Sequence, residues 1–105
     1  MFRHTNVAGA GVELVGSTLR LWGEVDYELA TVVADTLEAR LGLVRGALLV
    51  DAADVTFMDS AGLALLVRTT VVADRVVLLR ASEHVRDILA VTGAHGLFHA
   101  DPREI

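Results

Sequence analysis

The chain has 105 residues, 53% of them hydrophobic and 22% charged, so it is long enough for one compact domain and too apolar for a disordered segment. Its 14 acidic residues outnumber its nine arginines, it has no lysine, and its formal net charge is -5, so nucleic acid is a poor partner, because binding the phosphate backbone needs a basic face. The absence of cysteine excludes disulfides, thiolate chemistry and cysteine-ligated zinc.

No targeting or membrane segment is visible. Residues 1–20 lack the basic start and continuous apolar block of a secretory signal. The most apolar stretch, residues 62–79, is interrupted by Arg68, Asp74 and Arg75, and so falls short of the roughly 18 uninterrupted apolar residues that a membrane helix needs. We therefore expect a cytoplasmic protein with no direct membrane insertion.

The first half of the chain predicts a β-hairpin followed by a helix. Residues 12–15 and 18–23 form two apolar runs joined at Gly16-Ser17, and glycine supplies the positive φ that a tight turn requires. Asp26 then stands where a helix N-cap would, and Gly42 is a natural stop. Between them apolar residues recur every four positions: Leu29, Val33, Leu37 and Leu41.

The second half alternates strands and helices. Residues 47–50 predict a buried central strand that ends at Asp51, and residues 52–59 predict an irregular connection. A second helix is expected from Ser60 to about Val71, a buried strand over residues 76–79, and a third helix between Ser82 and Gly93. Residues 97–98 predict a final edge strand before a polar tail.

These elements predict an α/β fold. Strands separated by helices imply parallel pairing through crossovers, and the initial hairpin adds an antiparallel part. We expect a mixed sheet of four to five strands in a single domain over residues 1–105, with its core at about residues 12–99.

The candidate site lies where two predicted loops, residues 23–26 and 51–59, follow neighbouring strands at the carboxyl edge of the sheet. Both loops are acidic. Ser60 stands between Asp59 and the small pair Ala61-Gly62, so either Asp59 or Ser60 can cap the following helix, and the Ser60 hydroxyl is expected near the surface. A phosphoryl group there is tolerable at a helix start but not inside an interface without a cationic partner. Phosphorylation would then switch binding and not folding.

The residues alone leave plainer alternatives open. Ser60 can be a purely structural cap, as serine commonly is, and Asp26 can be an ordinary cap as well. Phe57 and Met58 can be two apolar residues that a loop folds back into the core. Spacing in the sequence does not decide between these interpretations and a binding role.

A resemblance to a known family bears on that choice. Residues 57–63, Phe-Met-Asp-Ser-Ala-Gly-Leu, resemble the Asp-Ser-(small)-Gly-Leu signature of STAS domains, in particular of bacterial anti-sigma factor antagonists. Residues 21–26, Leu-Trp-Gly-Glu-Val-Asp, resemble the family's Gly-Glu-(apolar)-Asp segment. The resemblance implies phosphorylation at Ser60. It implies partner contacts at Glu24, Asp26, Phe57, Met58, Asp59, Ala61 and Gly62.

The resemblance also implies a function without a cofactor. An unphosphorylated antagonist binds an anti-sigma factor, which is a serine kinase of the GHKL type, and so frees a sigma factor. The kinase uses ATP to phosphorylate the antagonist and release it, and a phosphatase resets the cycle. The chain would be a substrate and a binder, not an enzyme. The segment between Gly62 and Val76 is shorter than is usual for antagonists, which predicts a clipped helix or a tighter turn.

The sequence also bears on other functions. Residues 59–66 also resemble the STAS subunits of bacterial phospholipid-transport ABC systems, which clamp an ATPase subunit and need no phosphorylation. A hydrolase is disfavoured because Ser60 is not in a Gly-x-Ser-x-Gly elbow, and a nucleotide site because no glycine-rich phosphate loop is present. His95 and His99 have helical spacing, but a strand is expected between them, so a metal site is disfavoured.

Overall fold

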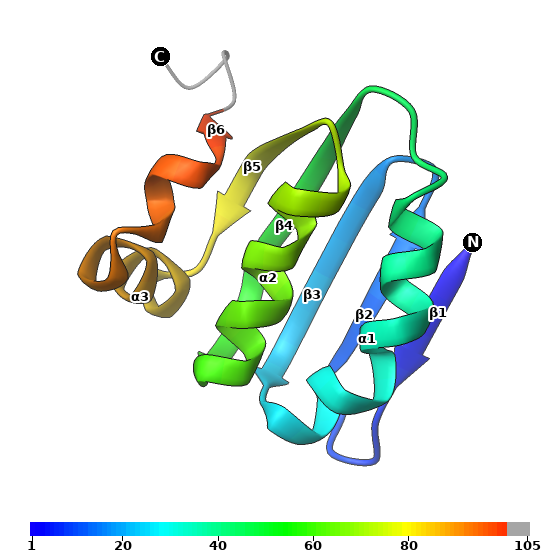
Figure 1. Ribbon diagram of the computed structural model, residues 1–105. Helices are drawn as coiled ribbons and strands as arrows, with labels where there is room; N and C mark the ends of the chain where they lie inside the picture. The colour runs from blue at the N-terminus through cyan, green and yellow to red at the C-terminus, as the bar shows by residue number, and fades with distance from the viewer. Residues whose placement is uncertain (101–105) are drawn as a thin grey trace.

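A six-stranded mixed sheet forms the centre of the molecule. The computed structural model describes residues 1–100, and the polar tail predicted after them lies outside that range. The strands stand in sequence order, antiparallel from β1 to β3 and parallel from β3 to β6 (Figure 1). They are β1 (Phe2–Thr5), β2 (Gly11–Val15), β3 (Thr18–Val25), β4 (Ala47–Met58), β5 (Arg75–Ala81) and β6 (His99–Ala100).

The helices are the crossovers between the parallel strands. α1 (Tyr27–Leu41) joins β3 to β4, and α2 (Ser60–Val72) joins β4 to β5. α3 (Glu83–Thr92) and the short 3-10 helix η1 (Ala94–Leu97) join β5 to β6. Because successive crossovers share one hand, α1 and α2 lie side by side on the same face of the sheet (Figure 1). α3 lies past the end of β5, where it packs against β4. No helix within residues 1–100 is long and apolar enough to cross a membrane.

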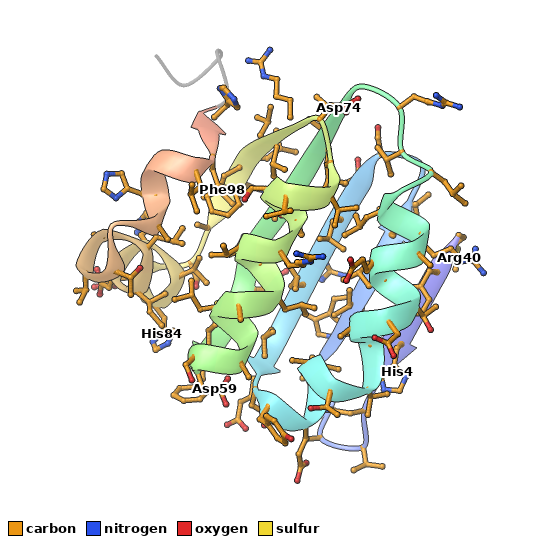
Figure 2. All side chains as sticks on the ribbon, in the orientation of Figure 1. His4, Arg40, Asp59, Asp74, His84 and Phe98 are labelled. Atoms are coloured by element: carbon orange, nitrogen blue, oxygen red, sulfur yellow. The ribbon has the colours of Figure 1, made fainter. Side chains whose placement is uncertain are left out.

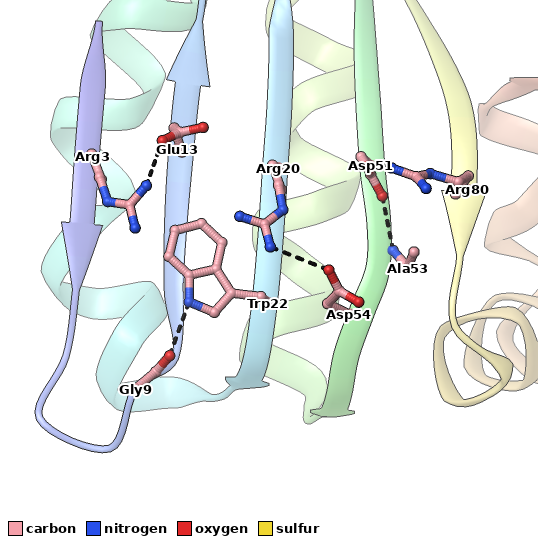
Figure 3. A network of polar contacts seen from close by, with 9 residues as sticks. All are labelled: Arg3, Gly9, Glu13, Arg20, Trp22, Asp51, Ala53, Asp54 and Arg80. Atoms are coloured by element: carbon pink, nitrogen blue, oxygen red, sulfur yellow. Dashed lines mark hydrogen bonds and ion pairs between the residues drawn. The ribbon is translucent and has the colours of Figure 1, made fainter.

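The core lies between the sheet and the α1–α2 layer. The four-residue repeat predicted for the first helix is confirmed, because Leu29, Val33, Leu37 and Leu41 are all buried. The opposite face of the sheet carries polar side chains (Figure 3). There the Trp22 ring stands between the guanidinium groups of Arg3 and Arg20, 5.0 and 4.7 Å from the ring centre, and Arg20 pairs with Asp54 at 3.2 Å.

The predicted α/β class, mixed sheet and N-terminal hairpin are confirmed. Gly16, with φ of 59°, occupies the two-residue turn between Val15 and Thr18. The Asp26 side chain caps α1 by accepting from the Leu29 N–H at 3.1 Å, and the Ser82 hydroxyl caps α3 in the same way. Gly93 ends α3 in the left-handed region.

The irregular connection predicted over residues 52–59 is wrong, because β4 continues to Met58. Its inner positions Val55 and Met58 are buried while Asp54, Thr56 and Phe57 are exposed, and β3 provides a hydrogen-bonding neighbour along this length. β3 also extends two residues beyond the prediction, to Val25. The two acidic segments are therefore strand ends and not loops.

The two edges of the sheet also differ from the prediction. β1 was not expected, since its alternation of half-buried Phe2 and His4 with exposed Arg3 and Thr5 is too weak to stand out without its partner β2. The final strand predicted at residues 97–98 is wrong by two positions. Gly93 directs the chain into η1, so pairing with β5 begins only at His99.

Candidate functional site

The two segments singled out in the sequence meet at one corner of the molecule. The ends of β3 and β4 are adjacent parallel strands, with Glu24 opposite Phe57 and Val25 opposite Met58. α1 begins directly after the first of these ends and α2 directly after the second. The corner therefore combines two strand ends and two helix starts, which is where loops of an open α/β sheet place functional groups.

Asp59 joins the two helix starts. It is the N-cap of α2, where its Oδ1 accepts from the Gly62 N–H at 2.9 Å. Its Oδ2 accepts from the Tyr27 N–H, the first residue of α1, also at 2.9 Å. One carboxylate thus satisfies an otherwise unpaired N–H in each helix, and it fixes the position of the residue that follows it.

Ser60 is exposed and is not the cap. It is the first residue of α2, and among residues 1–100 its hydroxyl has no hydrogen-bond partner, since Asp59 makes the cap contact. The sequence allowed either Asp59 or Ser60 as the cap, and in the structure the cap is Asp59. The interpretation of Ser60 as a structural cap is therefore wrong, and its hydroxyl is open to solvent at a helix start.

Gly62 lets α2 approach the sheet closely. A Cβ at this position would overlap the carbonyl oxygen of Val25 and would lie 2.9 Å from Met58 Cγ. Gly62 is buried in the first turn of α2, so its backbone packs directly on the end of β3. The glycine of the signature is required by this contact.

The remaining predicted contact residues divide into exposed and buried ones. Glu24 is exposed, and Asp26 and Ala61 are half-buried. Phe57 is 44% exposed, whereas Met58 is only 2% exposed, so the interpretation that both fold into the core holds for Met58 and fails for Phe57. Met58, like Gly62, supports the surface from beneath.

Two further residues belong to the site that the sequence did not predict. Tyr27 is 67% exposed beside the Asp59 contact. His84 comes from the first turn of α3, where its ring lies 5.4 Å from the Phe57 ring and its Nε2 lies 3.3 Å from the Met58 carbonyl oxygen. Figure 2 shows His84 and Asp59 near the same end of the molecule. His84 follows the signature by a whole strand, so no motif spacing could have indicated it.

An apolar groove runs from this corner between α1 and α2. The groove has a volume of about 360 Å³. An ion pair between Glu38 of α1 and Arg68 of α2, at 2.8 Å, crosses it from one helix to the other. This bond to Arg68 lowers the pKa of Glu38. The wall nearest the corner is formed by Tyr27, Ala61 and Ala64.

Within residues 1–100 no group of three or more histidine, aspartate or glutamate side chains is arranged to hold a metal ion.

Asp59 makes the corner sensitive to acid. The hydrogen bond from the Gly62 N–H, helped by that from Tyr27 and partly offset by desolvation, holds the pKa of Asp59 below its usual value. A pKa that is lower in the folded than in the unfolded chain gives stability that is present at neutral pH and is lost as the pH falls through the folded value.

We expect Asp59→Ala to lower the melting temperature at pH 7, because the Gly62 and Tyr27 N–H groups lose their acceptor. The difference from the wild type should shrink as the pH falls below about 4. Melting curves between pH 3 and 7 measure this difference in melting temperature. The control is Asp35→Asn, because Asp35 lies on the exposed face of α1. A difference that stays constant with pH would contradict a role of the ionised carboxylate.

Comparisons with known proteins agree with this architecture. The profile of the family described as "Mlab, STAS domain" matches residues 10–99, and the chain belongs to the STAS domain family. Among solved structures, one described as the unphosphorylated form of the anti-sigma factor antagonist SpoIIAA is similar, with a TM-score of 0.67 and 24% sequence identity. The match covers 91% of this chain and 90% of that one. A comparison with curated proteins finds no match.

Proposed function

We propose that this domain is an anti-sigma factor antagonist that acts by partner switching through Ser60. The observation that carries the proposal is the exposed, unbonded hydroxyl of Ser60 at the start of α2, held next to the Asp59 cap. A kinase can reach this hydroxyl without unfolding any part of the corner. The family signature and the SpoIIAA-like fold support the same function.

Charge explains how modification at this point would act as a switch. A phosphoryl group adds about -1.5 to -2 charges at neutral pH. The start of α2 favours a nearby anion by about 0.3–1 kcal/mol, so the fold tolerates it. A partner covering the corner would have to bury that charge next to the Asp59 carboxylate and at a strand end that also carries Glu24, which is far more costly. Phosphorylation would therefore release the partner and leave the domain folded.

In the proposed cycle the unmodified domain binds an anti-sigma factor that is itself a serine kinase of the GHKL type. That partner phosphorylates Ser60 with ATP and dissociates, and a phosphatase restores the hydroxyl. The domain is a cytoplasmic substrate and binder and performs no catalysis. Its net charge of -5 disfavours nucleic acid as a direct partner.

The test is phosphorylation by the GHKL-type serine kinases of the source organism, each purified and incubated with this protein and ATP. One kinase should increase the intact mass of the wild type by one phosphate. Ser60→Ala should show no increase, while Ser17→Ala, which removes the hydroxyl at the hairpin turn, should be labelled as the wild type is. Labelling that persists in Ser60→Ala would refute the assignment of the site.

A second candidate is a STAS subunit of a phospholipid-transport ABC system that binds its ATPase without phosphorylation. The family description "Mlab, STAS domain" and the resemblance of residues 59–66 favour it. Copurification with an ABC ATPase, equally strong for the wild type and Ser60→Ala and unchanged by kinase and ATP, would support this function and exclude the switch.

A further inference from the structure

We propose that His84 is a positioning residue that holds the Phe57 ring outward as the aromatic anchor of the partner-binding corner. The proposal rests on the proposed function for the existence of a partner. It assigns a role to α3, an element that contributes nothing to the Asp-Ser-Gly signature.

Phe57 is exposed close in sequence to the proposed modification site. Its neighbour Met58 turns inward, while Phe57 remains 44% exposed three residues before Ser60. A single exposed apolar side chain is ordinary in a folded protein. At an interface, however, aromatic side chains supply a large share of the binding energy when they enter a pocket in the partner.

The Phe57 ring is supported by a second aromatic ring. The His84 imidazole packs at 5.4 Å between ring centres and 38° between planes, while Phe57 stays 44% exposed. An aromatic group already held in one orientation loses less conformational entropy on binding than a free one.

The His84 imidazole is itself fixed in place. β4 pairs with β5 only as far as Ala52 opposite Ala81, so residues 53–58 have no strand neighbour on that side within residues 1–100. α3 lies there instead, and His84 Nε2–H donates to the Met58 carbonyl oxygen at 3.3 Å. Ser82 fixes the start of α3 by capping it and by donating its N–H to Ala52. His84 therefore joins the strand end to α3.

The partner would supply an apolar pocket for Phe57, next to the surface that receives the uncharged Ser60 hydroxyl. The binding test uses the kinase that phosphorylates Ser60, with affinities measured without ATP. Phe57→Ala should weaken binding about tenfold or more, and His84→Ala severalfold. In the Phe57→Ala background His84→Ala should cost nothing further, since the ring that it positions is gone. His84→Phe, which keeps a ring in this place, should recover most of the loss.

A second measurement needs no partner. The chain has three phenylalanines, so fluorophenylalanine labelling gives a simple ¹⁹F spectrum, in which Phe57→Leu assigns one signal. His84→Ala should move that signal towards the value of the free amino acid and narrow it. The matched control is His95→Ala, because His95 also contacts a backbone carbonyl, that of Leu89 at 3.4 Å, but lies beyond the other end of α3.

The two measurements separate the possible failures. The positioning role would be overturned if His84→Ala weakened binding equally in the wild type and in the Phe57→Ala background. It would also be overturned if His84→Ala left the Phe57 ¹⁹F signal unchanged. If the wild type bound no kinase but its Phe57 signal still responded to His84→Ala, the proposed function and the role of Phe57 as an anchor would be refuted. The contact between His84 and Phe57 would still stand. Coupling between the two residues in binding, with the expected signal change, supports the proposal.

Discussion

Gly62→Ala is expected to destabilise the domain by about 3 kcal/mol or more, one of the largest effects of any single methyl group in the chain. The added Cβ would overlap the Val25 carbonyl oxygen, which is backbone and cannot rotate away. Relief requires α2 to move off the end of β3, which would also disturb the Asp59 contact to the Gly62 N–H. The melting temperature should fall by roughly 15 °C.

The control for this substitution is Gly42→Ala at the end of α1. An added Cβ there lies 3.5 Å or more from its neighbours, and Gly42 has the ordinary helical φ of -62°. Its melting temperature should stay within a few degrees of the wild type. If both substitutions had the same small effect, α2 would not depend on a close approach at Gly62.

Ser60→Asp is expected to weaken binding to the partner kinase by roughly a hundredfold while leaving the fold intact. The added carboxylate stands at the positive end of α2 and directly after the Asp59 cap, so it favours the helix and opposes any interface over the corner. Calorimetric titration measures the affinity, and thermal melting measures the stability of the same sample.

The matched control places the same charge at the other end of the same helix. Val71 is 66% exposed in the last turn of α2. Val71→Asp should lower the melting temperature, because a negative charge opposes the helix dipole there, and should leave binding unchanged. A Ser60→Asp protein that binds as tightly as the wild type would show that charge at this position does not control the interface.

Much of the fold follows from local patterns. The four-residue repeat of α1, the caps Asp26 and Ser82, and the glycines at residues 16 and 93 act over a few positions, so the sequence alone predicts them. The course of β4 after Asp51 does not follow, because its acidic residues look like a loop until β3 is present as a pairing partner. β1 depends on pairing with β2 for the same reason.

The site was predictable where it is continuous in the chain. Within four residues, the Asp59–Gly62 segment predicted a helix cap at Asp59 or Ser60 and a hydroxyl near the surface. The close approach at Gly62 was not predicted, because it depends on the end of β3. The contact of Asp59 with Tyr27 and that of His84 with Phe57 bring together residues separated by 32 and 27 positions, as 59 − 27 and 84 − 57 give. Only the tertiary fold brings such pairs together, and no spacing in the sequence encodes them.

The most direct test of partner switching at Ser60 compares one preparation of the protein before and after stoichiometric phosphorylation by its kinase. Titration should show tight binding before modification and loss of at least about 99% of the affinity after it, with melting temperatures within a few degrees of each other. Phosphatase treatment should restore binding. Retained binding after phosphorylation, or loss of binding through unfolding, would contradict the account.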